Sequence, residues 1–201
     1  MAGESSTRSE PHARLPAFAD DAGALNVVVE TPQGSRNKYT FDEGLGVFRL
    51  GGVLPAGAVF PFDFGFVPGT LGGDGDPLDV LVLMDEPAFP GCLVHVRLVG
   101  AVEAEQTERD GETERNDRLI GVAAESRLQR HVRALGSLSP DLLEEIEHFF
   151  ISYNQIKGKE FKPLGRVGPQ KALALVEDGA KLYRQSTRKR APSKSSKKAR
   201  K

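Results

Sequence analysis

Three aspartates lie close together in this chain of 201 residues, where a polar turn enters an apolar segment. Asp74, Asp76 and Asp79 belong to the stretch Gly-Gly-Asp-Gly-Asp-Pro-Leu-Asp, which the apolar segment 80–84 follows directly. Carboxylates at this spacing repel one another unless a cation lies among them, and hard ions such as Mg²⁺ prefer oxygen ligands. An EF-hand loop is excluded, because Leu78 and Asp79 stand where that pattern requires Asp or Asn and then Gly. The motif indicates either a divalent-metal site or a solvated turn that uses Asp and Gly for their backbone preferences.

The charge of the chain divides into an acidic body and a basic end. The net charge is −1, but nine of the 27 Lys and Arg residues, and none of the 28 Asp and Glu residues, lie in 184–201. An acidic body is poorly suited to grip nucleic acid over a broad face, which requires clustered Lys and Arg. Metal cations are the more natural partners of its carboxylates, and we expect nucleic-acid contact only through the basic tail.

No segment of the sequence predicts insertion into a membrane. The longest strongly apolar run, 80–84, is much shorter than the roughly 20 residues of a spanning helix. Residues 1–16 lack the apolar core of a signal peptide. We therefore expect a cytoplasmic protein with no membrane partner.

Short strands are expected between residues 26 and 124, separated by turns rich in Gly, Pro and Asp. They cover 27–29, 38–41, 46–50, 59–66, 80–84, 93–102 and 118–123. This spacing favours a small barrel or sandwich over alternating strand and helix units. Phe60, Phe62, Phe64 and Phe66 recur with a period of two, which places their rings on one face as core filling. A barrel that binds nucleic acid is a further alternative, but this stripe lacks interleaved Lys or Arg.

Helices are expected after residue 124. A short one is predicted at 127–135, and a longer one follows Ser139-Pro140, a pair typical of a helix start. The longer helix carries an apolar stripe up to Tyr153 and ends near Gly158, and a third helix is predicted at 169–184.

The predicted organisation has three parts. Residues 1–24 are polar and aperiodic and are interpreted as a flexible N-terminal arm. Residues 25–184 form the folded domain, and residues 185–201 form a disordered basic tail.

The segment Asp74-Gly75-Asp76-Pro77-Leu78-Asp79 resembles the D-G-D-P-x-D signature of soluble family I inorganic pyrophosphatases. Other stretches between about residues 25 and 165 also resemble this family, namely 28–32, 37–39, 60–66 and 149–153. The resemblance implies an α+β, mainly β fold, with a five-stranded OB-like barrel flanked by C-terminal helices. It also implies a homo-oligomer with Mg²⁺ as cofactor, or Mn²⁺ in its place, that hydrolyses pyrophosphate or a related phosphoanhydride.

The resemblance assigns roles to seven residues. The implied metal ligands are Glu30, Asp74, Asp76 and Asp79. Asp76 would also orient and deprotonate the attacking water. The implied substrate-binding residues are Lys38, Arg118 and Tyr153. An acidic pocket can hold a highly charged anion only with metal ions between them, and such metals also activate the water. Without the resemblance, Lys38 is typical of a solvated strand charge and Tyr153 of a core ring.

Several positions depart from the family's pattern. A family acid is replaced by Thr40, an Asp-Arg pair by Gly51-Gly52, two site tyrosines by Phe60 and Phe64, and two metal-binding aspartates by Gln106 and Asn116. The phosphate-binding lysine is replaced by Arg118, and the lysine after Tyr153 by Asn154. One preorganised charge-stabilising donor is typically worth about 10²–10³ in kcat. We therefore expect slow turnover or a shifted substrate preference. The alternative is a catalytically degraded relative that serves as a metal-binding, phosphate-binding or assembly protein.

The position of Asn116 tests this alignment. Side chains two residues apart share one face of a strand, so Asn116 is expected on the face of Arg118 while Asp117 points away. The surrounding segment 103–117, which is rich in Glu, is expected to be an ordinary solvated hairpin.

Overall fold

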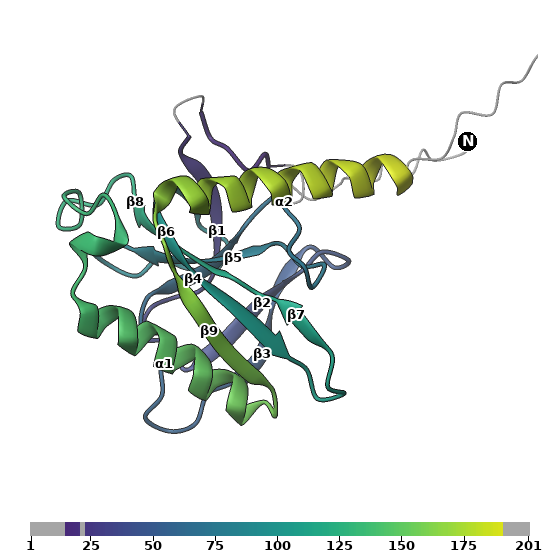
Figure 1. Cartoon of the computed structure of the whole chain (residues 1–201), viewed down its shortest axis with the longest axis horizontal. Helices are drawn as coiled ribbons and strands as arrows, with labels where there is room; N and C mark the ends of the chain where they lie inside the picture. The colour runs from purple at the N-terminus through teal and green to yellow at the C-terminus, as the bar shows by residue number, and fades with distance from the viewer. Residues whose placement is uncertain (1–14, 21–22, 191–201) are drawn as a thin grey trace, which may run out of the picture.

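The computed structural model describes residues 15–20 and 23–190 (Figure 1). Over these ranges the strands are β1 (Leu25–Thr31), β2 (Asn37–Asp42), β3 (Val47–Val53), β4 (Asp63–Val67), β5 (Leu78–Leu83), β6 (Leu93–Thr107), β7 (Thr113–Arg115), β8 (Arg118–Ala123) and β9 (Glu160–Val167). The helices are the 3₁₀ turn η2 (Leu135–Ser137) and the α-helices α1 (Pro140–Ile156) and α2 (Pro169–Arg190).

Five strands close into a barrel. The larger sheet has the order β1-β4-β5-β8-β6, and β1 also pairs with β6, so the first and last strands of this series are neighbours. The pairings are antiparallel except for the parallel pair β5–β8. The predicted five-stranded OB-like barrel is confirmed. β7 and β9 extend the sheet from β6, and β2 with β3 forms a separate hairpin.

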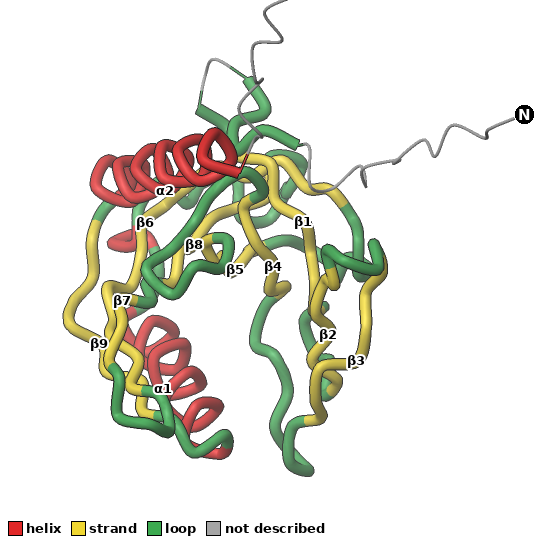
Figure 2. Tube along the Cα trace, turned by 90° about the vertical axis from the view of Figure 1, so that its right-hand side faces the viewer, coloured by secondary structure: helices red, strands yellow, loops and turns green. Residues whose placement is uncertain are grey.

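The two α-helices cover different sides of the barrel (Figure 2). Helix α1 contributes Leu143, Ile146 and Phe150 to a cluster that contains Phe60 and Phe64. Helix α2 contributes Ala172, Val176 and Ala180 to a second cluster against β1, β5 and β6. Phe60 and Phe64 are only 1% and 5% exposed, so these rings fill the core as predicted and do not offer a stacking surface.

Helix α1 begins and ends as predicted. The side chain of Ser139 accepts the backbone N–H of Leu142, and Pro140 occupies the first turn, where the missing N–H costs nothing. Gly158 has a φ of 72° just beyond the helix, a conformation that favours glycine and turns the chain away. These local signals fix both ends of the helix.

The helix predicted at 127–135 is wrong. This segment forms turns, and only the 3₁₀ turn η2 follows. The carboxylate of Asp85 accepts the backbone N–H groups of Arg127 (2.9 Å) and Leu128 (3.2 Å) and the hydroxyl of Ser126 (2.5 Å). A distant acid therefore anchors the start of this segment to the end of β5.

Strand β9 was not predicted. It pairs with β6 along residues 101–107, so β6 is longer than the segment 93–102 expected from the sequence. The strand contains Pro163 and Gly165, and Phe161 is its only buried residue. A strand with one exposed face and little apolar alternation gives a weak sequence signal. The expected hairpin at 103–117 is present, built by β6 and β7.

The ends of the folded domain differ from the predicted boundaries. Helix α2 continues to Arg190 rather than ending at 184, so the first residues assigned to a disordered tail are helical. Residues 191–201 lie outside the described part of the chain, as do 1–14 and 21–22 of the expected N-terminal arm. Ala17, within that arm, is 5% exposed and its carbonyl accepts the N–H of Asn26, so this part of the arm packs on the barrel.

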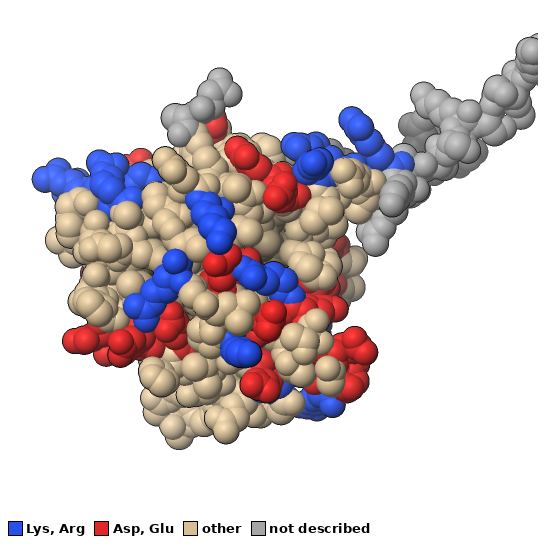
Figure 3. Space-filling view, in the orientation of Figure 1, with Lys and Arg blue, Asp and Glu red and all other residues tan. Residues whose placement is uncertain are grey.

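Two further observations concern the surface. On the face drawn in Figure 3, acidic and basic side chains are interspersed and no broad basic area is visible. Over the described residues, neither helix is long and apolar enough to cross a membrane.

Candidate active site

A cavity of about 510 Å³ lies between residues 72–79, here called the aspartate loop, the β2–β3 hairpin and the C-terminal end of α1. In Figure 2, α1 lies at the lower left and the β2–β3 hairpin at the right of the trace. The seven residues assigned to the site from the sequence all line it, although they come from six different elements: Glu30, Lys38, Asp74, Asp76, Asp79, Arg118 and Tyr153. The barrel therefore brings together what the sequence separates by more than 120 positions.

The aspartate loop is held by its own backbone. Asp74 accepts the N–H of Asp76 at 3.1 Å, and the N–H of Gly72 donates to the carbonyl of Asp76 at 2.7 Å. Gly75 has a φ of 82°, which lets the turn close without strain. Asp79 then lies at the start of β5, where it pairs with Phe66 of β4. The three carboxylates are therefore positioned by a tight turn and a sheet edge.

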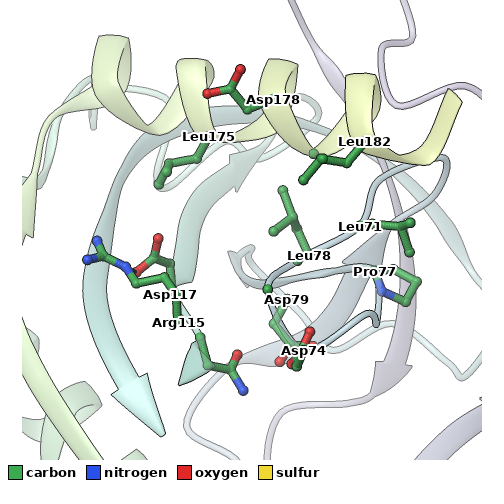
Figure 4. A pocket seen from close by; sticks show the side chains of 14 residues that line it. Leu71, Asp74, Pro77, Leu78, Asp79, Arg115, Asp117, Leu175, Asp178 and Leu182 are labelled. Carbon is green, nitrogen blue, oxygen red and sulfur yellow. Dashed lines mark hydrogen bonds and ion pairs between the residues drawn. The ribbon is translucent and has the colours of Figure 1, made fainter. Parts of the chain in front are cut away.

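Helix α2 supports this loop from behind. A second cavity of about 150 Å³ lies between the helix and the loop, and it shares Asp74 and Asp79 with the larger one. In Figure 4, Asp74 and Asp79 lie together on the side away from the helix, and Leu175 and Leu182 of α2 face the loop. The carbonyl of Gly179 accepts the N–H of Leu71 at 3.0 Å, which ties the loop to the helix.

The electrostatics of the loop favour a bound cation. Burial raises the pKa of Asp74, and the charges of Asp76 and Asp79 raise it further. Burial also raises the pKa of Asp76, again with a contribution from the Asp79 charge. A cation beside these groups would offset both effects.

The carboxylate oxygens of the aspartate loop fit Mg²⁺ if water or substrate supplies its other ligands. Among the described residues, no three His, Cys, Asp or Glu side chains converge closely enough to hold a metal ion by themselves. Mg²⁺ does not require such a cage, because it usually keeps several waters and binds one or two carboxylates together with substrate phosphates. The aspartate oxygens of the loop are ligands of that kind.

Opposite the loop, Glu30 and Lys38 form an ion pair. Lys38 Nζ lies 2.7 Å from Glu30 Oε2, and it also lies 4.2 Å from the centre of the Phe64 ring. The other carboxylate oxygen of Glu30 accepts the N–H of Phe41 at 2.8 Å. Both side chains are thus fixed before any ligand binds.

Arg118 is the most buried cation of the cavity, with 5% exposure. Its guanidinium donates to Asp79 Oδ2 at 2.6 Å and to the side-chain oxygen of Asn116. Asp117 points away from the cavity and accepts the N–H of Ala104 and the guanidinium of Arg115. The predicted placement of Asn116 and Arg118 on one face, with Asp117 on the other, is confirmed.

Tyr153 and two lysines close the cavity at the end of α1. Burial raises the pKa of Tyr153 to about 12, so its hydroxyl stays protonated. Lys157 Nζ donates to that hydroxyl, and Lys159 forms an ion pair with Glu108 at 2.6 Å. Lys157, Lys159 and Glu108 line the cavity but were not predicted. Their signal was the pair of lysines around Gly158, just past a helix that carries Tyr153.

Comparison with known proteins agrees with this geometry. The model of the family described as inorganic pyrophosphatase matches residues 27–184. This chain belongs to the inorganic pyrophosphatase family. It is 39% identical over 171 residues to the inorganic pyrophosphatase of Synechocystis sp., covering 85% of this chain and 98% of that protein.

Solved structures of the family share the fold. The inorganic pyrophosphatase of Thermus thermophilus matches with a TM-score of 0.79 and 36% identity, covering 86% of this chain and 98% of that chain. The inorganic pyrophosphatase of Helicobacter pylori matches with a TM-score of 0.75 and 33% identity, covering 85% of this chain and 99% of that chain.

Most of the positions that depart from the family's pattern lie at the same cavity. Those that line it are Thr40, Phe64, Gln106, Asn116, Arg118 and Asn154. Asn154 is 3% exposed and its amide donates to the carbonyl of Phe150, so it is occupied within the helix. The positions that the sequence resemblance suggests as departures are therefore concentrated at this cavity.

Proposed function

We propose that this chain hydrolyses inorganic pyrophosphate to two phosphates, with Mg²⁺ as cofactor or Mn²⁺ in its place. The observation that carries the proposal is the meeting in one cavity of the family's three aspartates with Lys38, Arg118 and Tyr153. The relatives named inorganic pyrophosphatase support the same reaction. A related phosphoanhydride is the alternative substrate.

The cavity has two walls, namely the aspartate loop and the side chains opposite it, and the proposed mechanism gives each a different task. Asp74, Asp76 and Asp79 would hold the metal, with Glu30 as an outer ligand, and the bound metal supplies a water of lowered pKa. Asp76 would orient the attacking water and accept its proton, as the resemblance implies.

The other wall binds the substrate. Lys38 and Arg118 neutralise charge on the phosphoryl oxygens, while the protonated hydroxyl of Tyr153 donates a hydrogen bond. We further propose that turnover is slow. Arg118 is held by Asp79 and Asn116, so a metal at Asp79 must compete with an existing ion pair.

The second candidate is a metal-binding or phosphate-binding protein without turnover. The observation that favours it is the pairing of two proposed metal ligands with cations: Glu30 with Lys38, and Asp79 with Arg118. If these pairs persist in the presence of metal, the cavity binds an anion without activating water.

Phosphate release from pyrophosphate separates the two candidates. The purified chain is assayed with Mg²⁺, with Mn²⁺ and with a chelator, next to the variants Asp76→Asn and Asp110→Asn. Asp110 is an exposed hairpin residue that accepts the N–H of Glu112, and an asparagine can keep that bond, so it is the matched control. Hydrolysis that requires metal and is lost only in Asp76→Asn supports the proposal. Equal rates for Asp76→Asn and the wild type would reject it.

We also propose a homo-oligomer, as the resemblance implied. The exposed apolar side chains around the β2–β3 hairpin support this: Leu45, Val47, Leu50 and Val53. Light scattering at micromolar concentration tests it, and a monomer mass would contradict it. The cytoplasmic location and the role of the basic tail stay predictions from the sequence.

A further inference from the structure

Four cations line the cavity in the described part of the chain, and three of them are paired with acids. Lys38 pairs with Glu30, Arg118 with Asp79, and Lys159 with Glu108. For the fourth, Lys157, the described residues offer no ion pair. Its Nζ donates to the neutral hydroxyl of Tyr153 and lies 4.1 Å from the centre of that ring. A cation without a carboxylate partner, at the rim of an anion-binding cavity, needs a separate explanation.

The main chain around Lys157 is fixed on both sides. Lys157 ends helix α1, and its N–H donates to the carbonyl of Asn154 at 2.9 Å. Arg109, from the β6–β7 hairpin, donates through Nε to the carbonyl of Lys157 at 2.7 Å. Cations at the end of a helix are favoured by its exposed carbonyl groups. The residue therefore has a stable position beside Tyr153 rather than a random one on the surface.

The surroundings of the Lys157 ammonium favour the binding of an anion. Burial, followed by the charges of Lys38, Lys159 and Arg118, lowers the pKa of Lys157 to about 8. The charge of Asp79 opposes this effect only in part, and in the described part of the chain no carboxylate pairs with Lys157 to compensate for the repulsion. An incoming phosphate would do so, and it could pair with Lys157 without first displacing a protein carboxylate.

We infer that Lys157 Nζ binds a phosphoryl oxygen of the substrate and takes over the role of the cations missing at Gly52 and Asn154. The inference rests on the proposed function. Asn154 cannot serve in this way, because its amide is buried and bonded to Phe150. Lys157 reaches the same cavity from one turn further along the chain, next to the Tyr153 hydroxyl.

Steady-state kinetics test the inference in the intact chain. The variants are Lys157→Met, Lys157→Arg and the control Lys162→Met, which removes an exposed lysine of β9 outside the cavity. Because a hydrogen bond to a charged group is worth more than a neutral one, we expect Lys157→Met to raise KM by about 10- to 100-fold. The inhibition constant of product phosphate should rise in parallel. Lys157→Arg should recover most of the loss, and Lys162→Met should match the wild type.

Calorimetric titration with inorganic phosphate gives a second, independent measurement. Weaker phosphate binding in Lys157→Met, at an unchanged melting temperature, supports the inference. A wild type that does not hydrolyse pyrophosphate would reject the proposed function but not this inference. The inference is overturned if Lys157→Met keeps the wild-type KM and phosphate affinity, or if the wild type binds no phosphate.

Discussion

The two walls of the cavity are built in different ways. The aspartate wall is local: three acids within six residues are held by a backbone turn and backed by α2. The opposite wall is assembled from β1, β2, β8, the end of α1 and the residues next to β6 and β9. Its cations Lys38 and Lys159 pair with acids of the same wall, whereas Arg118 pairs with Asp79 across the cavity. A loop that is shaped by hydrogen bonds to its backbone depends on its whole local sequence. In a wall that is held by pairs of side chains, single residues can be substituted more easily. The D-G-D-P-x-D segment is intact, and the positions that the resemblance suggests as departures lie outside it.

The largest expected effect comes from the aspartate wall. Asp76→Asn keeps the size of the side chain but removes the proton acceptor, so we expect kcat to fall by about 10²–10³ or more. The matched change on the other wall, Lys159→Met, removes a cation that is already bound to Glu108 and should cost about tenfold or less. Parallel measurement of kcat and KM checks the contrast. A larger loss in Lys159→Met than in Asp76→Asn would contradict the division of tasks.

A substitution in α2 can disturb the packing of this helix against the aspartate loop. A side chain at Gly179 would place its Cβ 2.9 Å from Leu78 Cδ1 and 3.1 Å from the carbonyl oxygen of Leu71, so the loop would have to move. We expect Gly179→Val to cost about 1–3 kcal/mol of unfolding free energy. It should also lower kcat by about tenfold, because small displacements of a site are costly.

Urea unfolding and the hydrolysis assay measure these two effects. Ala174→Val, on the exposed side of the same helix, is the control for valine in α2. If Gly179→Val loses stability but keeps full kcat, then α2 does not position the aspartates.

A cation can be added at Gly52 to the wall opposite the aspartate loop. A Cβ at this position meets nothing within 4 Å, and Gly52 pairs with Lys38 across the β2–β3 hairpin, so a new side chain lies on the face of a cavity residue. Gly52→Arg should therefore add a phosphate-binding cation and raise kcat/KM by about tenfold.

Gly52→Met provides the control for Gly52→Arg, with a long side chain but no charge. An increase in both variants would show that the strand, rather than the cation, limits the reaction. No increase in either would contradict the view that this wall was weakened by loss of charge.

The same division decides what could be predicted from the sequence. The short strands and α1 with its caps were predicted because turn signals and periodicity carry them. The five-stranded barrel and the roles of the seven site residues were implied by the resemblance to the family, which rests on the aspartate motif and a few shorter matches. Lys157 and Lys159 were missed, since their meaning depends on Tyr153 and on Glu108, which is 51 positions before Lys159. The helix predicted at 127–135 was wrong, and the sequence pattern there also gave no sign that the N–H groups at its start bond to Asp85, more than 40 positions earlier. Contacts between distant side chains leave no periodic pattern.

The smallest effect concerns stability and pH in the metal-free protein. Burial raises the pKa values of Asp74 and Asp76 above the ordinary 3.8, so the folded state keeps these protons where the unfolded state has lost them. Their contribution to stability is therefore greatest below the unfolded value and is lost as the pH rises through the folded values. Mg²⁺ binds the ionised carboxylates, so the rise in melting temperature that it causes should be larger at pH 7 than at pH 4.

The two walls should respond differently to this titration. In Asp74→Asn/Asp76→Asn, the extra stabilisation by Mg²⁺ at pH 7 should disappear, because the carboxylates that bind the metal in their ionised form are gone. In Lys157→Met it should remain, since that lysine belongs to the wall that binds phosphate. Thermal unfolding of the three proteins at pH 4 and pH 7, with and without Mg²⁺, provides the comparison. An equal Mg²⁺ shift at both pH values in the wild type would mean that the metal binds outside the aspartate loop, and the separation into a metal wall and a phosphate wall would then be wrong.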